Sequence, residues 1–181
     1  MKLLTLITAF ALFLSTVAKT QSTPKPADEI LKEACQQATS ENKNVFIMFH
    51  ASWCGWCRKL DASMNDASCK QFFDNNYVIK HMVVYESKGK ENLETPGALD
   101  LLAKYQANDN GVPYWFIFDK DGKLLADSKM RPEGAGLETG DNIGCPANKE
   151  EVAYFINILK KTSKLNSPQL AVISKRFREN E

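Results

Sequence analysis

The sequence feature that most constrains the fold is a pair of cysteines, Cys54 and Cys57, separated by two residues. The β-branched and aromatic residues 45–50 before the pair predict a buried strand, and the spacing of Leu60 and Met64 after it indicates a helix. Cys54 is therefore expected where a strand ends and a helix begins. Two such cysteines can close a small disulfide, and the free N–H groups of the first helical turn stabilise a thiolate on the first of them.

The length of 181 residues, with 44% hydrophobic and 10% aromatic content, predicts one globular domain with a single buried core. The 23 basic and 22 acidic residues give a net charge of +1. A balance so close to zero gives no sign of binding to nucleic acid or to an acidic surface.

The N-terminus predicts export. Lys2 is followed by the apolar run 3–17, and small residues occupy Thr16 and Ala18, the positions that a signal peptidase inspects. An uncleaved anchor is the alternative, but the run is shorter than the roughly 20 residues of a membrane-spanning helix. We therefore expect a signal peptide over residues 1–20. The mature domain, residues 21–181, would then lie in the periplasm or outside the cell, without stable membrane insertion and where disulfides persist.

The rest of the chain predicts alternating helices and strands. Helices are expected over 28–42, from Cys54 to a break near Asp66 and on through Phe73, and over 98–105, 148–162 and 168–178; strands are expected over 45–50, 77–85, 114–118 and 123–127. Two strands separated by a helix of the size of 98–105 predict a crossover unit and a parallel pair. Asp121-Gly122 predicts an antiparallel hairpin. Asp66, Asn148 with Glu151, and Ser167-Pro168 are expected to begin helices.

This order of elements, together with Trp53-Cys54-Gly55-Trp56-Cys57 and Gly111-Val112-Pro113, resembles the thioredoxin superfamily. Within it, the chain is similar to secreted bacterial thioredoxin-like proteins whose Trp-Cys-x-x-Cys motif is followed by basic residues. The resemblance covers residues 28–163. It implies an α/β three-layer sandwich, in which a central mixed sheet is flanked by helices, and leaves the helix over 168–178 as a C-terminal addition.

The resemblance also implies the roles of the motif residues. Cys54, exposed at the helix start, would be the nucleophile in disulfide exchange, and Cys57 would be the resolving thiol. Gly55 and Trp56 would tune the reduction potential of the pair. Trp53 would offer a rigid apolar surface to an extended or unfolded partner.

Val112 and Pro113 correspond to the superfamily's cis-proline site. The resemblance implies that Pro113 faces the disulfide and that the backbone of Val112 pairs with a substrate strand. An ordinary trans proline at the start of an edge strand is the alternative, and base rates alone would favour it.

The function implied is thiol–disulfide exchange with exported protein partners, without a metal or organic cofactor. A structural disulfide or half of a zinc site is the alternative for the cysteine pair, but the chain has only His50 and His81 as further zinc-binding imidazoles. Arg58 after the motif excludes haem attachment. A redox-silent binding module for extended client segments is the rival function. The direction of electron flow, the client, an electron donor in the membrane and the oligomeric state stay open.

One position departs from the superfamily. Many thioredoxin-type reductants keep a buried carboxylate six residues before the first cysteine, where it takes the proton of the resolving thiol. Met48 occupies that position here and cannot accept a proton. His50 is a candidate acceptor for the proton of Cys57, although packing or solvation is the commoner role of such a histidine, and His81 is a weaker candidate.

Three further cysteines, Cys35, Cys69 and Cys145, leave an odd remainder whose pairing stays open. Burial is the expected state of Cys35 and Cys69. Cys145 lies in a glycine-rich loop, 130–146, which with residues 86–97 is expected to shape partner choice. The basic residues 175–178 are expected to be a solvated helix face.

Overall fold

The computed structural model describes residues 24–181, so the predicted signal peptide lies outside the described residues. The helices are α1 (Ala27–Glu41), α2 (Gly55–Met64), α3 (Lys70–Asn76), α4 (Ala98–Lys104), α5 (Lys149–Thr162) and α6 (Ser167–Arg178). The strands are β1 (Asn44–His50), β2 (Tyr77–Val83), β3 (Tyr114–Phe118), β4 (Leu124–Asp127), β5 (Lys129–Met130) and β6 (Asp141–Asn142). A short 3-10 helix, η1 (Glu91–Leu93), precedes α4.

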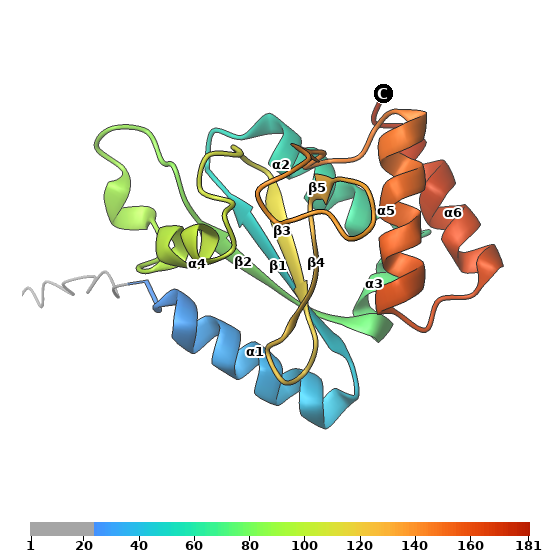
Figure 1. The fold of residues 1–181 in the computed structure, drawn as a ribbon, viewed down its shortest axis with the longest axis horizontal. Coiled ribbons are helices and arrows are strands. Elements are labelled where there is room, and N and C mark those ends of the chain that lie inside the picture. Colours follow the sequence, from blue (N-terminus) through green and yellow to red (C-terminus); the bar gives the residue numbers. More distant parts are fainter. Residues whose placement is uncertain (1–23) are drawn as a thin grey trace, which may run out of the picture.

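Four strands form the central sheet in the order β2-β1-β3-β4 (Figure 1). β1 and β2 run parallel, because α2 and α3 return the chain to the end of the sheet from which β1 began. β3 runs antiparallel to both β1 and β4. The mixed sheet and the hairpin at Asp121-Gly122 are thus confirmed. The parallel pairing expected across the helix over 98–105 is wrong, because β1 lies between β2 and β3 and pairs antiparallel with β3.

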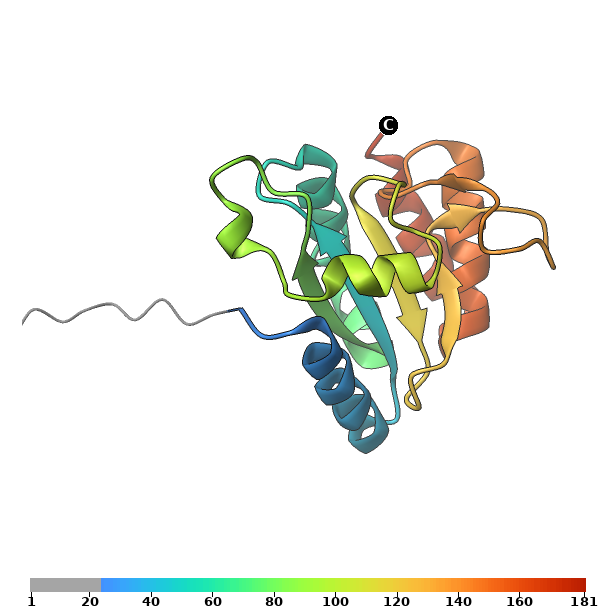
Figure 2. The same cartoon turned by 60° about the vertical axis from the view of Figure 1, so that its left-hand side comes forward.

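Alternating side chains of β1 divide the core into two layers. Val45, Ile47 and Phe49 pack with α1 and α4, whereas Phe46 and Met48 face α2, α3, α5 and α6. Figure 2 shows α1 and α4 on one side of the sheet and α5 and α6 on the other. The three-layer sandwich is therefore confirmed.

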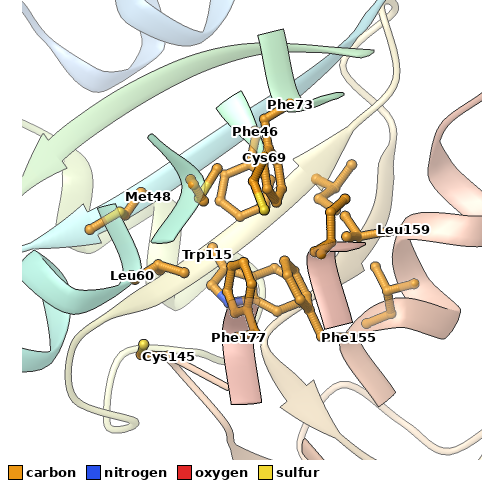
Figure 3. Packing of buried hydrophobic residues seen from close by; sticks show 14 of the residues in the cluster. Phe46, Met48, Leu60, Cys69, Phe73, Trp115, Cys145, Phe155, Leu159 and Phe177 are labelled. Carbon is orange, nitrogen blue, oxygen red and sulfur yellow. The ribbon is translucent and has the colours of Figure 1, made fainter. Parts of the chain in front are cut away.

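An aromatic cluster joins the last two helices to the sheet (Figure 3). The ring of Phe155 on α5 lies 5.5 Å from that of Trp115 on β3 and 5.0 Å from that of Phe177 on α6. Phe73 on α3 stacks on Phe155 with ring centroids 6.4 Å apart. Because Phe177 is completely buried, α6 is part of the core rather than an appendage.

The structure differs from the sequence predictions at several element ends. The Asp66 side chain caps the turn before α3, accepting the N–H of Ser68 at 2.9 Å, while the helix itself begins after Cys69. Asn166, rather than Ser167, is the N-cap of α6 and forms a capping box with Gln169. Asn148 and Glu151 form the predicted capping box of α5.

The expectation that residues 175–178 form a solvated face is wrong except for Lys175. Arg176 forms an ion pair with Asp66 at 3.1 Å, and Arg178 donates a hydrogen bond to the carbonyl of Ala147. Charge alone could not show this, because the partners lie on elements distant in sequence.

Candidate active site

A disulfide joins Cys54 and Cys57 at the start of α2. Cys54 is the N-cap residue, and its sulfur accepts a hydrogen bond of 3.0 Å from the backbone N–H of Cys57. The strand-to-helix position predicted for the pair is confirmed. When the disulfide is reduced, this N–H and the helix N-terminus favour the thiolate form of Cys54.

The expectation that Cys54 is exposed is wrong, because only 2% of the residue is accessible. Its N-cap geometry turns the side chain back over the first turn of α2, where Cys57 is 3% exposed. The exposed part of the motif is instead aromatic: Trp53 is 54% and Trp56 49% exposed. Gly55, between the second tryptophan and Cys54, is also exposed.

Side-chain contacts hold the two tryptophans in place. The indole N–H of Trp53 donates to the carbonyl of Tyr85 at 2.8 Å. Next to it, Ser52 donates its backbone N–H and its hydroxyl to the Glu86 carboxylate at 2.5 and 2.7 Å, and these bonds lower the pKa of Glu86. The ammonium of Lys59 lies 4.2 Å from the ring centre of Trp56.

The peptide bond between Val112 and Pro113 is cis, as the resemblance implied. Val112 and Pro113 line a groove of about 300 Å³ together with Trp56 of the motif. The other wall comes from the loop that follows β6. Its lining is completed by Asn110, Gly111, Asn142, Ile143, Gly144 and Cys145. We call this space the proline groove.

Asn142 fastens the two walls of the proline groove together. Its side-chain NH₂ donates to the carbonyls of Asn110 and Pro113 at 2.9 and 3.1 Å. Its side-chain oxygen accepts the N–H of Gly144 at 2.9 Å and the hydroxyl of Ser128 at 2.7 Å. Sequence reasoning missed Asn142, because an asparagine in a long loop carries no signature of its distant partners.

A second cavity, of about 220 Å³, borders Cys57. Met48, His50, Asp61 and His81 line it with Cys57, and Ala51, Ser52 and Arg58 complete the lining. We call this space the histidine cavity. Met48, which replaces the carboxylate of many thioredoxin-type reductants, therefore lies in one cavity with both histidines and with the predicted resolving cysteine.

The histidines lie side by side on β1 and β2. The ring centres of His50 and His81 are 5.4 Å apart, and Nε2 of His81 lies 3.5 Å from a carboxylate oxygen of Asp61. Burial lowers the pKa of His50, and the neighbouring His81 lowers it further. His50 is therefore neutral near pH 7 and able to accept a proton.

Cys35, Cys69 and Cys145 are free thiols. The burial expected for Cys69 is confirmed, while Cys35 is only partly buried. Cys145 is buried beside the proline groove, and burial raises the pKa of its thiol to about 12. A thiol with such a pKa is almost entirely protonated at neutral pH and is a poor nucleophile.

Among residues 24–181, no cluster of three or more histidine, cysteine or acidic side chains is arranged to hold a metal ion. Within the same residues, no helix has the length and apolar content needed to cross a membrane.

The sequence matches the family model of the thioredoxin-like domain over residues 31–133, more than half of the chain. The chain therefore belongs to the thioredoxin-like family, whose class of chemistry, thiol–disulfide exchange, agrees with the disulfide at the start of α2. No match to a curated protein sequence was found.

Several solved structures are distantly similar. A disulphide isomerase from Xylella fastidiosa Temecula1 is 22% identical, with a TM-score of 0.46 over 66% of this chain and 80% of that one. A DsbH oxidoreductase is 21% identical, with a TM-score of 0.45 over 79% and 85% of the two chains. The C-terminal domain of Neisseria meningitidis DsbD, in its oxidised form, is 23% identical, with a TM-score of 0.40 over 57% and 84%.

Proposed function

We propose that the chain is an exported thiol–disulfide oxidoreductase that exchanges disulfides with protein partners through Cys54 and Cys57. The observation that carries the proposal is the disulfide at the start of α2, where the Cys57 N–H donates to the Cys54 sulfur. Membership of the thioredoxin-like family supports the same class of chemistry. The exchange itself needs no metal or organic cofactor, since both sulfurs belong to the chain.

The reaction proceeds in two steps when the reduced protein meets a partner disulfide. The Cys54 thiolate attacks one partner sulfur, forming a mixed disulfide and releasing the other partner sulfur as a thiolate. The Cys57 sulfur then attacks the Cys54 sulfur, re-forming the Cys54–Cys57 disulfide and releasing the second partner thiolate. Cys57 loses one proton in the second step. The reverse sequence delivers a disulfide to a partner dithiol.

The partner lies across the exposed tryptophans and the proline groove. Trp53, Gly55 and Trp56 supply the exposed surface around the disulfide, and the shared groove brings Trp56 next to Val112 and Pro113. Because Cys54 is only 2% exposed, an extended chain lying close against this surface presents its sulfur better than a folded convex one. This requirement favours exported proteins with accessible cysteines as clients.

The reduction potential of the Cys54–Cys57 couple tests the proposal. The protein is equilibrated against thiol buffers of defined potential, and its oxidised fraction is read by thiol alkylation and mass. A value near about −270 mV indicates a reductant that an electron donor must recharge, and one near about −120 mV indicates an oxidant. A couple that does not exchange would overturn the proposal and favour the redox-silent binding module.

Export and the mature domain, residues 21–181, belong to the same proposal. The apolar run after Lys2 supports cleavage near residue 20. The mass of the protein recovered from the envelope or medium of expressing cells tests it. A mass that includes residues 1–20 would contradict cleavage.

A further inference from the structure

The second exchange step requires a group that takes the proton of Cys57, and Met48 cannot supply one. Met48 is 2% exposed and lines the histidine cavity. It occupies the position at which many thioredoxin-type reductants keep a buried carboxylate. The same cavity borders Cys57 and contains His50 and His81. A cavity of about 220 Å³ with these polar groups has room for water molecules that bridge the imidazole and the sulfur.

We propose that His50 accepts the proton of the Cys57 thiol through water in the histidine cavity, and that His81 and Asp61 connect His50 to solvent. This inference rests on the proposed function and deepens it, because it assigns a proton acceptor to the resolving step. His50 and His81 lie on β1 and β2, whereas Val112 and Pro113 of the proline groove precede β3, on the other side of β1.

The proton moves from the Cys57 sulfur to the neutral imidazole of His50, and the sulfur electron pair attacks Cys54. The bond between Cys54 and the partner sulfur breaks, and the partner leaves as a thiolate with that bond's electron pair. The imidazolium then releases its proton toward His81 and bulk water. In the reverse reaction, with a partner thiolate as reductant, the protonated His50 returns the proton to Cys57.

The charges around His50 suit a group that changes its protonation during each cycle. From α2, Asp61 and Arg58 line the cavity, and the Arg58 guanidinium donates to the carbonyl of Ser52 at 3.1 Å. From β2, His81 faces His50 and lies 3.5 Å from Asp61. Glu86 approaches from the segment after β2. Burial and His81 lower the pKa of His50, while Glu86 and Asp61 act in the opposite direction and keep the imidazolium accessible.

The two exchange steps can be timed separately with 5,5′-dithiobis(2-nitrobenzoate) in a Cys35→Ser background, which removes the partly buried free thiol that would also react. The reagent then releases one coloured thiolate when Cys54 attacks and a second when Cys57 resolves the mixed disulfide. We expect His50→Gln to slow the second release at least about tenfold near neutral pH, a modest loss for a proton acceptor. Its pH profile should also lose the inflection that the imidazole produces. The first release should keep its rate.

Lys80→Gln is the matched control. Lys80 precedes His81 on β2 but points to the opposite face, where it donates to Gln37 of α1. The Lys80→Gln substitution removes a nearby charge without changing the histidine cavity, so both releases should keep their wild-type rates and pH profiles. A second release slowed equally in both variants would overturn the inference.

A measurement on the unmodified protein tests the inference even if the His50→Gln variant misfolds. The chain has only two histidines, so their imidazole signals can be titrated by NMR in the oxidised and the reduced protein. We expect the titration of His50 to change with the redox state. An identical titration in both states would overturn the inference.

The two releases distinguish a failure of the proposed function from a failure of the role of His50. If the wild type gives no first release, the proposed function falls and takes the inference with it. If the first release is normal but His50→Gln leaves the second release and its pH profile unchanged, only the role of His50 falls.

Discussion

The proline groove and the histidine cavity both border the Cys54–Cys57 motif, but different kinds of structural element form them. The proline groove is walled by two loops, which Asn142 ties together through backbone carbonyls. The histidine cavity is lined by titratable side chains from β1, α2 and β2. This difference suggests that partner recognition and proton transfer are served by separate sides of the motif.

The two sides of the motif also differ in how much sequence change they tolerate. Loops tolerate substitution and length change better than the strands that carry them. His50 and His81 stand on adjacent paired strands, in a sheet that fixes their separation. Under the proposed function, we therefore expect partner choice to vary on one side and the proton route on the other to stay constant.

The largest effect is expected from the cysteines that both sides share. Cys54→Ser should abolish disulfide exchange, because it removes the N-cap sulfur that accepts the Cys57 N–H at the start of α2. Cys57→Ser should instead accumulate mixed disulfides with partners, since the first step remains and the resolving thiol is gone. Non-reducing gels and mass spectrometry of the trapped adducts measure both results. Equal trapping by the two variants would contradict the assigned order of attack.

The next largest effect is expected from disturbing the close contact between Gly144 and Pro113 in the proline groove. A Cβ on Gly144 would lie 2.8 Å from the carbonyl oxygen of Pro113, at a positive φ of 45°. Gly144→Ala should therefore lower the free energy of unfolding by about 2–4 kcal/mol, which combines left-handed strain with overpacking. Exchange with a protein disulfide should fall more than exchange with a small one.

Gly134→Ala is the control for backbone strain, because Gly134 has φ +82° but nothing within 4 Å of its added Cβ. It should cost only about 1–2 kcal/mol, and its two exchange rates should fall together if at all. Denaturant unfolding and the two exchange assays provide the comparison. If both variants behave alike, the contact between Gly144 and Pro113 does not shape the groove.

A smaller effect is expected when a different proton acceptor is placed in the histidine cavity. In the His50→Gln background, Met48→Asp places a carboxylate in the same cavity, and we expect it to restore most of the lost second-release rate. Burial should raise the pKa of this carboxylate, so the restored rate should carry a new inflection. Met48→Leu in the same background is the control and should restore nothing. Rescue by both substitutions would point to packing rather than proton transfer.

The sequence predicted what depends on local pattern. Apolar periodicity located every long helix and the four strands of the main sheet, and the position of Cys54 followed from them. The two-residue strands β5 and β6 were missed because they are too short to show a period. The burial of Cys54 was missed because it follows from the direction of an N-cap side chain, which spacing does not encode.

The two sides of the motif were predicted to different extents for a physical reason. Val112 and Pro113 could be named from a resemblance, but Asn142 acts through carbonyls of residues far away in the chain. His50 could be named as a candidate because it is close to Cys54 in sequence. Its cavity with His81 and Asp61 exists only because β1 and β2 pair in this register, with Met48 opposite His81.

The smallest expected effect is a pH dependence of stability that belongs to the histidine cavity alone. Because burial and His81 lower the pKa of His50 below its ordinary value of 6.5, the folded state binds fewer protons than the unfolded state below that pH. The oxidised protein should therefore lose stability as the pH falls from about 6.5 toward the folded-state pKa of His50.

Denaturant unfolding of the oxidised protein between pH 5 and 8 measures this slope. His50→Gln should flatten it, while Lys80→Gln should leave it as in the wild type. If the slope persists in His50→Gln, other groups cause it, and the cavity does not hold His50 in its neutral form. A flattened slope would show that His50 is the group whose lowered pKa causes the loss of stability, and that the cavity holds its imidazole neutral.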